Sequence, residues 1–93
     1  MNVRYTRRAF ADREAIFAYL HERSPAAATA VVGLIATRIA GLATAPFKGR
    51  KTDRVGLYSL LIAPYPYRVF YRIEIDGVAI LHIRHTARRP WSV

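Results

Sequence analysis

The chain has 93 residues, which is enough for one small domain, spanning residues 1–93, with a single hydrophobic core. It contains no cysteine, which excludes a disulfide framework and any cysteine-ligated metal site. Fifteen lysines and arginines against six acidic residues give a net charge of +9, which predicts attraction to nucleic acid or to an acidic protein. No apolar run approaches the roughly 20 residues of a membrane span, and the N-terminus lacks the apolar core of a signal peptide. We therefore expect a cytoplasmic protein with no membrane association.

Two helices are predicted in the first half of the chain. Residues 8–23 carry apolar side chains at helical spacing. Ser24 is a favourable N-cap and Pro25 a favourable first helical residue, so a second helix begins there and runs to about residue 43. We expect the two helices to form a hairpin with an apolar inner face.

The remaining apolar segments indicate strands, at residues 3–6, 57–62, 67–75 and 78–85. Asp76-Gly77 is a strong two-residue turn signal between the last two strands. The order β-α-α-β-β-β predicts an α+β fold. In it, an N-terminal strand and an α-helical hairpin accompany a mainly antiparallel sheet of three to four strands, with the helices on one face.

The predicted hairpin places two chemically capable residues opposite one another. If Asp76 and Gly77 are the whole loop, Arg68 faces His85 on the side of the sheet away from the helices. A cation beside His85 favours neutral imidazole, which can accept a proton, and Arg68 could stabilise charge on a phosphate or bind a carboxylate. The alternative is that His85 caps the end of its strand and Arg68 is solvated.

Other titratable residues carry weaker signals. His82 is expected on the helix face, hydrogen-bonded near Tyr71, as a satisfied core histidine. The acids of the first helix, Asp12, Glu14 and Glu22, are expected on a solvated face. No histidine or carboxylate spacing indicates a metal and no glycine-rich loop indicates a phosphate cofactor, so we expect neither.

Several short segments, taken in order, carry a family resemblance. They are Ala11–Leu20, Ser24–Ala27, Leu42–Pro46 with Gly49, Tyr65–Tyr71 and Ile80–Arg88. With the order of elements, they make nearly the whole chain resemble the RelE/ParE superfamily of toxins from type II toxin–antitoxin modules. The first helix and the Ser-Pro pattern are most similar to the ParE branch, whose members are often called plasmid stabilisation proteins.

The ParE resemblance implies a toxin that inhibits DNA gyrase and is neutralised by a cognate antitoxin. That antitoxin would have a DNA-binding N-terminal domain and an acidic, partly disordered C-terminal segment, and would form a hetero-oligomer with the toxin. The RelE branch implies instead a ribosome-dependent mRNA endonuclease, for which Arg68 and His85 match catalytic positions. The aromatic residue that often follows in such nucleases is absent, because Thr86 and Ala87 follow His85. We therefore favour a gyrase inhibitor over a nuclease, with an inactive antitoxin-binding homologue as a third alternative.

Three groups of residues are candidates for binding. The expected target-binding residues are Arg68, Arg72, Arg88, Arg89 and Trp91. Residues expected to steer a polyanion such as RNA, or to form only a solvated turn, are Lys48, Arg50, Lys51 and Arg54. The residues expected to contact the antitoxin are Phe10, Phe17, Tyr58, Tyr67 and Phe70.

Overall fold

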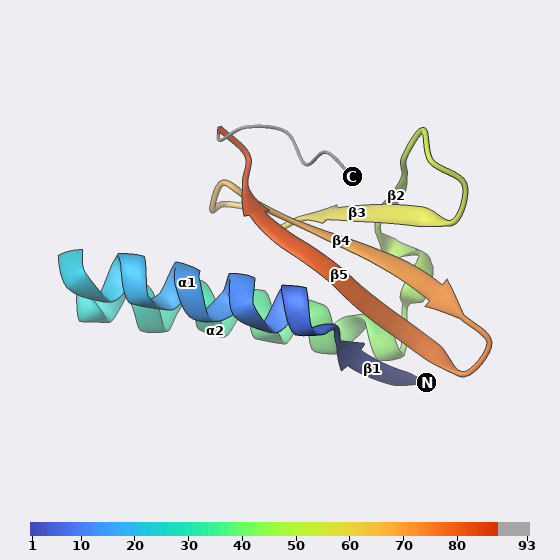
Figure 1. Cartoon of the computed structure of the whole chain (residues 1–93), viewed down its shortest axis with the longest axis horizontal. Coiled ribbons are helices and arrows are strands. Elements are labelled where there is room, and N and C mark those ends of the chain that lie inside the picture. The colour runs from blue at the N-terminus through green and yellow to red at the C-terminus, as the bar shows by residue number, and fades with distance from the viewer. Residues whose placement is uncertain (88–93) are drawn as a thin grey trace.

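The computed structural model describes residues 1–87, which form a helical layer against one face of a twisted sheet (Figure 1). The elements are β1 (Asn2–Tyr5), α1 (Arg7–Arg23), α2 (Pro25–Ala40), the short 3-10 helices η1 (Gly41–Ala43) and η2 (Pro46–Lys48), β2 (Arg50–Lys51), β3 (Leu57–Leu61), β4 (Tyr67–Glu74) and β5 (Gly77–His85). Over these residues the strands form one five-stranded sheet in the order β1-β5-β4-β3-β2, in which only the β1–β5 pair is parallel. The predicted α+β class, with a helical hairpin on one face of a mainly antiparallel sheet, is confirmed. The sheet is wider than expected because residues 50–51 pair with β3.

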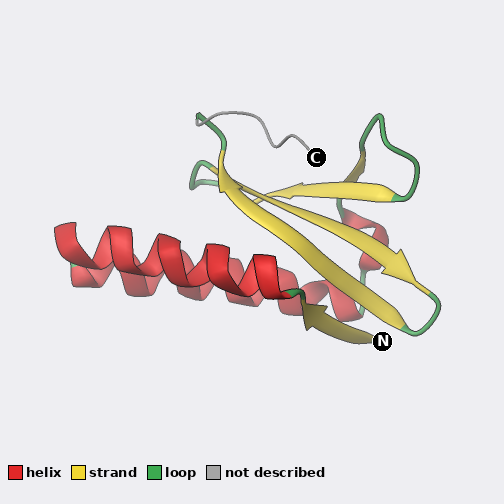
Figure 2. Ribbon diagram, in the orientation of Figure 1, coloured by secondary structure: helices red, strands yellow, loops and turns green. Residues whose placement is uncertain are grey.

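Each long helix begins at a capping side chain. The Thr6 hydroxyl accepts a hydrogen bond from the Ala9 N–H (3.2 Å) and donates one to the Ile80 carbonyl (2.7 Å), so it ties the start of α1 to β5. The Ser24 hydroxyl accepts from the Ala27 N–H (3.1 Å), and the Ser24 N–H bonds back to the last turn of α1. One serine thus ends the first helix and begins the second, which explains the short connection at the closed end of the hairpin (Figure 2).

The second helix supplies much of the core. Val31, Ile35 and Ile39 of α2 are buried against the sheet. The helical segment over residues 25–43 is 19 residues long and apolar enough to cross a membrane by length and composition, contrary to the expectation from sequence. A helix that packs into the core of a compact domain has the same composition. The sheet contributes to the same core mainly through Leu60, Tyr67, Val69, Tyr71, Val78, Ile80 and Ile83, and Ile62 joins them directly after β3.

The turn between β4 and β5 differs from the predicted one. Glu74 pairs with Gly77, so Ile75 and Asp76 form the turn and Gly77 is already part of the strand. A Cβ atom at Gly77 would overlap the carbonyl oxygen of Asn2 in the neighbouring strand β1. The glycine is therefore required by the close approach of β1.

A β-bulge shifts the register a second time. Phe70 pairs with His82 and Tyr71 pairs with Ile80, so Leu81 is an extra residue in β5. From His82 onward, each side chain of β5 lies on the face opposite to the one that a ladder without the bulge would give it. This second shift determines which residues share the face away from the helices.

Candidate functional site

The face of the sheet away from the helices carries the candidate site. Tyr67, Val69 and Tyr71 of β4 are buried toward the helices. Because side chains alternate along a strand, Arg68 and Phe70 lie on the opposite, open face. Residues that pair across neighbouring strands point to the same face of the sheet. By these pairings, the open face carries Arg4, Arg50, Arg68, Arg72 and Arg84.

Part of this positive charge is compensated. Glu74 accepts hydrogen bonds from Arg4 at 3.2 and 3.1 Å, and its Oε2 lies 3.5 Å from an Arg72 nitrogen. Side chains this exposed gain little from such pairs in water. Glu74 therefore orders one corner of the open face and leaves the region around Arg68 strongly positive.

Arg68 occupies the centre of the remaining positive region. Its Nη1 donates to the hydroxyl of buried Ser59 (2.9 Å), and Arg84 lies directly opposite it on β5. Like charges at directly opposed positions destabilise a sheet unless an anion or a partner group lies between them. A depression of about 290 Å³ opens beside Arg68 toward β2, lined by Lys48, Gly49, Arg50, Ser59, Leu60, Leu61 and Arg68. This arrangement is suited to an oxyanion such as phosphate or carboxylate.

The predicted Arg68–His85 pair is wrong. His85 pairs with Tyr67 and meets its ring edge-on at 5.2 Å between centroids, so it lies on the face opposite to Arg68. The Nδ1 of His85 accepts a hydrogen bond from the Ala87 N–H at 3.1 Å. The bulge at Leu81 places His85 on that face, whereas the shifted turn changes the pairing by two residues and leaves the faces unchanged. The catalytic roles suggested for Arg68 and His85 remain predictions, but the two side chains lie on opposite faces of the sheet.

His82 is the satisfied histidine that the sequence indicated, but with different partners. Its Nδ1 lies 2.7 Å from Oδ2 of Asp12, and the same oxygen accepts the Ile83 N–H at 3.0 Å. The ring stacks on Phe70, at 6.0 Å between centroids, on the open face. The expectations that Asp12 is solvated and that His82 lies on the helix face near Tyr71 are therefore wrong. No spacing rule connects residues 12 and 82, so sequence patterns gave no signal for this contact.

A buried tyrosine missed by sequence reasoning holds the segment that leads into β2. The Tyr71 hydroxyl donates to the Pro46 carbonyl (2.8 Å) and accepts from the Gly49 N–H (2.9 Å). Burial raises the pKa of Tyr71 above its ordinary value of 10.0, with the Gly49 hydrogen bond acting in the other direction. A Cβ atom at Gly49 would lie 2.7 Å from the Ser59 carbonyl, so only glycine fits. Residues 46–49 are thus fixed at both ends to one hydroxyl.

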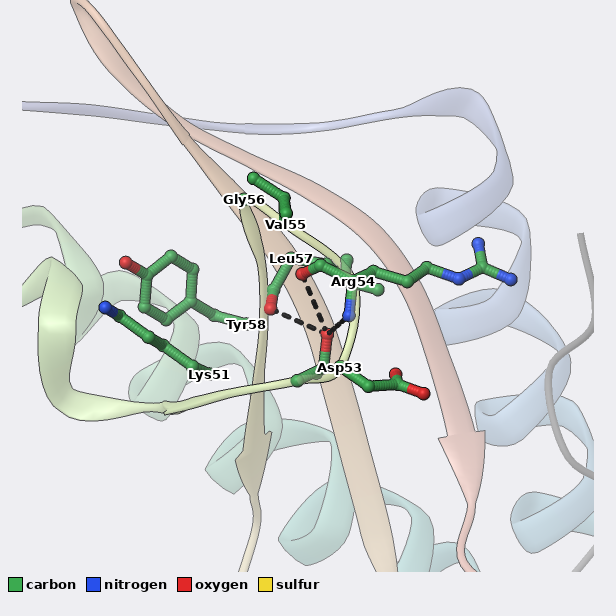
Figure 3. A pocket seen from close by; sticks show the side chains of 8 residues that line it. Lys51, Asp53, Arg54, Val55, Gly56, Leu57 and Tyr58 are labelled. Carbon is green, nitrogen blue, oxygen red and sulfur yellow. Dashed lines mark hydrogen bonds between the residues drawn. The ribbon is translucent and has the colours of Figure 1, made fainter.

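The predicted polyanion-steering residues do not converge on one point. Lys48 and Arg50 line the depression beside Arg68. Lys51 pairs with Tyr58 and extends along its ring, whereas the Arg54 side chain points away from both (Figure 3). In the turn between them, the Thr52 hydroxyl donates to the Leu57 carbonyl at 2.9 Å, which closes a second hollow of about 310 Å³. This segment therefore contains an edge strand, β2, which places Arg50 and Lys51 on opposite faces of the sheet.

The residues expected to contact an antitoxin differ in accessibility. Phe10 and Phe17 are exposed on α1, and Tyr58 and Phe70 are half-buried. Tyr67 is 4% exposed and belongs to the core, so its expected availability as a docking residue is wrong. Tyr67 is the first residue of β4, and its side chain points toward the helices, as do those of Val69 and Tyr71.

Three expected target-binding residues, Arg88, Arg89 and Trp91, lie outside the described residues. Arg68 and Arg72 of the same group share the open face. Within residues 1–87, no group of three or more histidine or carboxylate side chains is placed to hold a metal ion. The described part of the site is therefore an arginine-rich surface around Arg68 and Phe70.

Comparisons with known proteins show that this chain is similar to toxins. The family model described as the ParE toxin of the type II toxin–antitoxin system parDE matches residues 3–90. Putative toxin Y4kP of Sinorhizobium fredii is 37% identical over 89 residues, which cover 96% of this chain and 91% of that protein. Toxin RelE2 of Caulobacter vibrioides is 37% identical over 84 residues, which cover 90% of this chain and 93% of that protein.

Two solved structures share the fold. A chain of the chromosomal ParDE system of P. aeruginosa superposes with a TM-score of 0.79 and 26% identity, covering 91% of this chain and 95% of that one. A chain of the RelBE2 toxin–antitoxin complex of Mycobacterium tuberculosis superposes with a TM-score of 0.58 and 28% identity, covering 90% and 95%.

Proposed function

This chain belongs to the ParE toxin family of type II toxin–antitoxin systems, and from that premise we propose that it inhibits DNA gyrase by binding, without chemistry of its own. The observation that carries this proposal is the separation of Arg68 from His85 on opposite faces of the sheet. Cleavage of RNA by a base and a charge-stabilising cation needs both groups at one phosphate. The closer overlap with the ParDE-type chain than with the RelBE2-type chain adds support.

A gyrase assay with purified toxin tests the proposal. We expect loss of ATP-dependent supercoiling, or accumulation of a trapped cleavage complex, at toxin concentrations near that of gyrase. Addition of the antitoxin restores supercoiling. Unchanged supercoiling together with no trapped complex, at toxin levels that arrest growth when expressed, contradicts gyrase as the target.

A cognate antitoxin is the second part of the proposal. The solved relatives come from ParDE and RelBE2 systems, which supports a hetero-oligomer here too. An acidic, partly disordered antitoxin segment would neutralise the open face and cover exposed Phe10 and Phe17 on α1. Such a complex would form in the cytoplasm. Co-expression with the adjacent gene and purification of a stable complex tests it.

A ribosome-dependent mRNA endonuclease remains the second candidate. The depression beside Arg68, lined also by Lys48 and Arg50, favours it because these cations can receive a phosphate of the RNA backbone. Programmed 70S ribosomes with a defined mRNA separate the two candidates. Cleavage that is lost in Arg68→Ala supports the nuclease, and intact mRNA at growth-arresting toxin levels contradicts it.

A further inference from the structure

We propose that Phe47, with Lys48 and Lys51, forms a stacking platform for single-stranded nucleic acid at the β2 edge of the sheet. Phe47 is 70% exposed, although it is a large apolar side chain on an ordered segment. Its ring meets the Tyr58 ring at 6.0 Å between centroids with an interplanar angle of 72°. This contact and the high exposure leave most of the Phe47 ring open to solvent.

Contacts with two tyrosines of the sheet hold the Phe47 ring in place. Tyr58 stacks on Tyr71 at 5.6 Å between centroids, so Phe47, Tyr58 and Tyr71 form a continuous aromatic column from the surface into the core. The Tyr71 hydroxyl also binds the backbone on both sides of Phe47, at the Pro46 carbonyl and the Gly49 N–H. An exposed aromatic ring on a fixed backbone loses little conformational entropy when a ligand stacks on it.

Two lysines accompany this ring. Lys48 follows Phe47 directly and lines the depression beside Arg68. Lys51 pairs with Tyr58, the residue that Phe47 contacts, and its side chain extends along the Tyr58 ring (Figure 3). Single-stranded nucleic acid places a phosphate on each side of every base, and proteins bind it by stacking bases on aromatic rings beside positive charge.

The shape of the surface favours a nucleobase over an acidic peptide. Apolar side chains of a peptide bind in concave pockets. Phe47 instead protrudes, and a protruding ring offers a flat surface that suits a base. This contact is independent of gyrase, because it needs only the toxin and a nucleic acid, and it therefore extends beyond the proposed function.

Fluorescence anisotropy with the purified full chain and a short labelled oligothymidylate at low salt tests the platform. We expect Phe47→Ala, and also Phe47→Leu, to weaken binding by about tenfold, since stacking contributes that much per base. Phe47→Trp should retain the affinity. Lys48→Ala should lower the slope of log affinity against log salt by about 0.7, the value of one single-strand phosphate contact, whereas the Phe47 variants should leave that slope unchanged.

Two matched controls make the result specific. Phe10→Ala removes another exposed aromatic residue beside an arginine, on α1, and Val55→Ala removes an exposed apolar residue from the β2–β3 turn. Both should bind like the wild type.

Wild-type affinity in Phe47→Ala, an equal loss in Phe10→Ala, or no binding of the oligonucleotide by the wild type overturns the proposal. If Phe47→Leu weakens the binding of a poly-glutamate peptide as much as that of the oligonucleotide, the proposal is overturned in favour of an acidic peptide. Unchanged gyrase inhibition by Phe47→Ala, together with its weakened binding of the oligonucleotide, separates this platform from the proposed function.

Discussion

Asp12 and His82 lie 70 positions apart in the chain and meet at 2.7 Å between Oδ2 and Nδ1. The same Asp12 oxygen accepts the Ile83 N–H at 3.0 Å, beyond the point where β1 stops pairing with β5. One carboxylate therefore completes the hydrogen bonding of a strand edge and orients an imidazole. This ties α1 to β5 and holds the imidazole ring that stacks on Phe70.

We predict that Asp12→Ala destabilises the protein by about 1–3 kcal/mol, because it leaves the Ile83 N–H and the His82 ring without their acceptor. Urea unfolding followed by circular dichroism measures the change. Glu14→Ala is the matched control, since it removes an exposed carboxylate from the same helix, and its effect should stay within about 0.5 kcal/mol. Equal effects of the two substitutions would show that the buried contact contributes nothing.

Tyr71→Phe should cost about 1–3 kcal/mol, because it leaves the Pro46 carbonyl and the Gly49 N–H without their shared partner in a partly buried site. The aromatic stack with Tyr58 is retained, so packing changes little. Tyr58→Phe keeps the same stack and serves as the control. A Tyr71→Phe variant as stable as Tyr58→Phe contradicts a structural role for the hydroxyl.

The advantage of tyrosine over phenylalanine at position 71 should shrink at alkaline pH. Burial raises the pKa of Tyr71 in the folded protein above 10.0, the value expected when the chain is unfolded. The stabilisation is therefore complete below pH 10.0 and decreases as pH rises through the folded-state pKa, because the unfolded state releases its proton first. Urea unfolding of wild type and Tyr71→Phe across this range gives the difference directly, and the titration of other groups cancels in it. A difference that stays constant as pH rises above 10.0 contradicts the raised pKa.

Local signals along the chain predicted the helices, whereas contacts between residues distant in sequence decide the arrangement of the site. The Ser24-Pro25 pattern located the boundary between α1 and α2 correctly, because capping depends only on neighbouring residues. The open face could not be assigned in the same way. Gly77 is required by β1 and not by the turn, and nothing around Leu81 announces the bulge. The shifted turn changes which residues are paired, and the bulge moves the side chains after it to the other face. Arg68 was therefore correctly expected on the open face, whereas His85 was not.

Gly49→Ala should destabilise the protein by about 1–3 kcal/mol, the usual cost of overpacking, because the added methyl group would lie 2.7 Å from the Ser59 carbonyl oxygen. Gly33→Ala is the opposite case. A Cβ atom at Gly33 meets nothing within 4 Å, and the residue lies within α2. This variant should be more stable than the wild type by about 0.5–1 kcal/mol, the difference in helix propensity between the two residues. Thermal unfolding of both variants checks the pair, and a stable Gly49→Ala protein would show that residues 46–49 can move away from β3.

Arg68→Ala should reduce toxicity more than Arg13→Ala does. Arg68 lies at the centre of the positive open face, hydrogen-bonded to Ser59 and beside the depression that can receive an anion. Arg13 lies over the rings of Tyr5 and Phe10, where its main contacts are within the protein. Removing Arg68 relieves the repulsion with the arginine opposite it but also removes the donor to the buried Ser59 hydroxyl, so the two effects on stability oppose one another. Growth after induction without antitoxin measures toxicity, and circular dichroism confirms folding. We expect the same direction for Arg88→Ala, a position outside the described residues. Equal toxicity of the Arg68 and Arg13 variants would mean that the target binds elsewhere on the molecule.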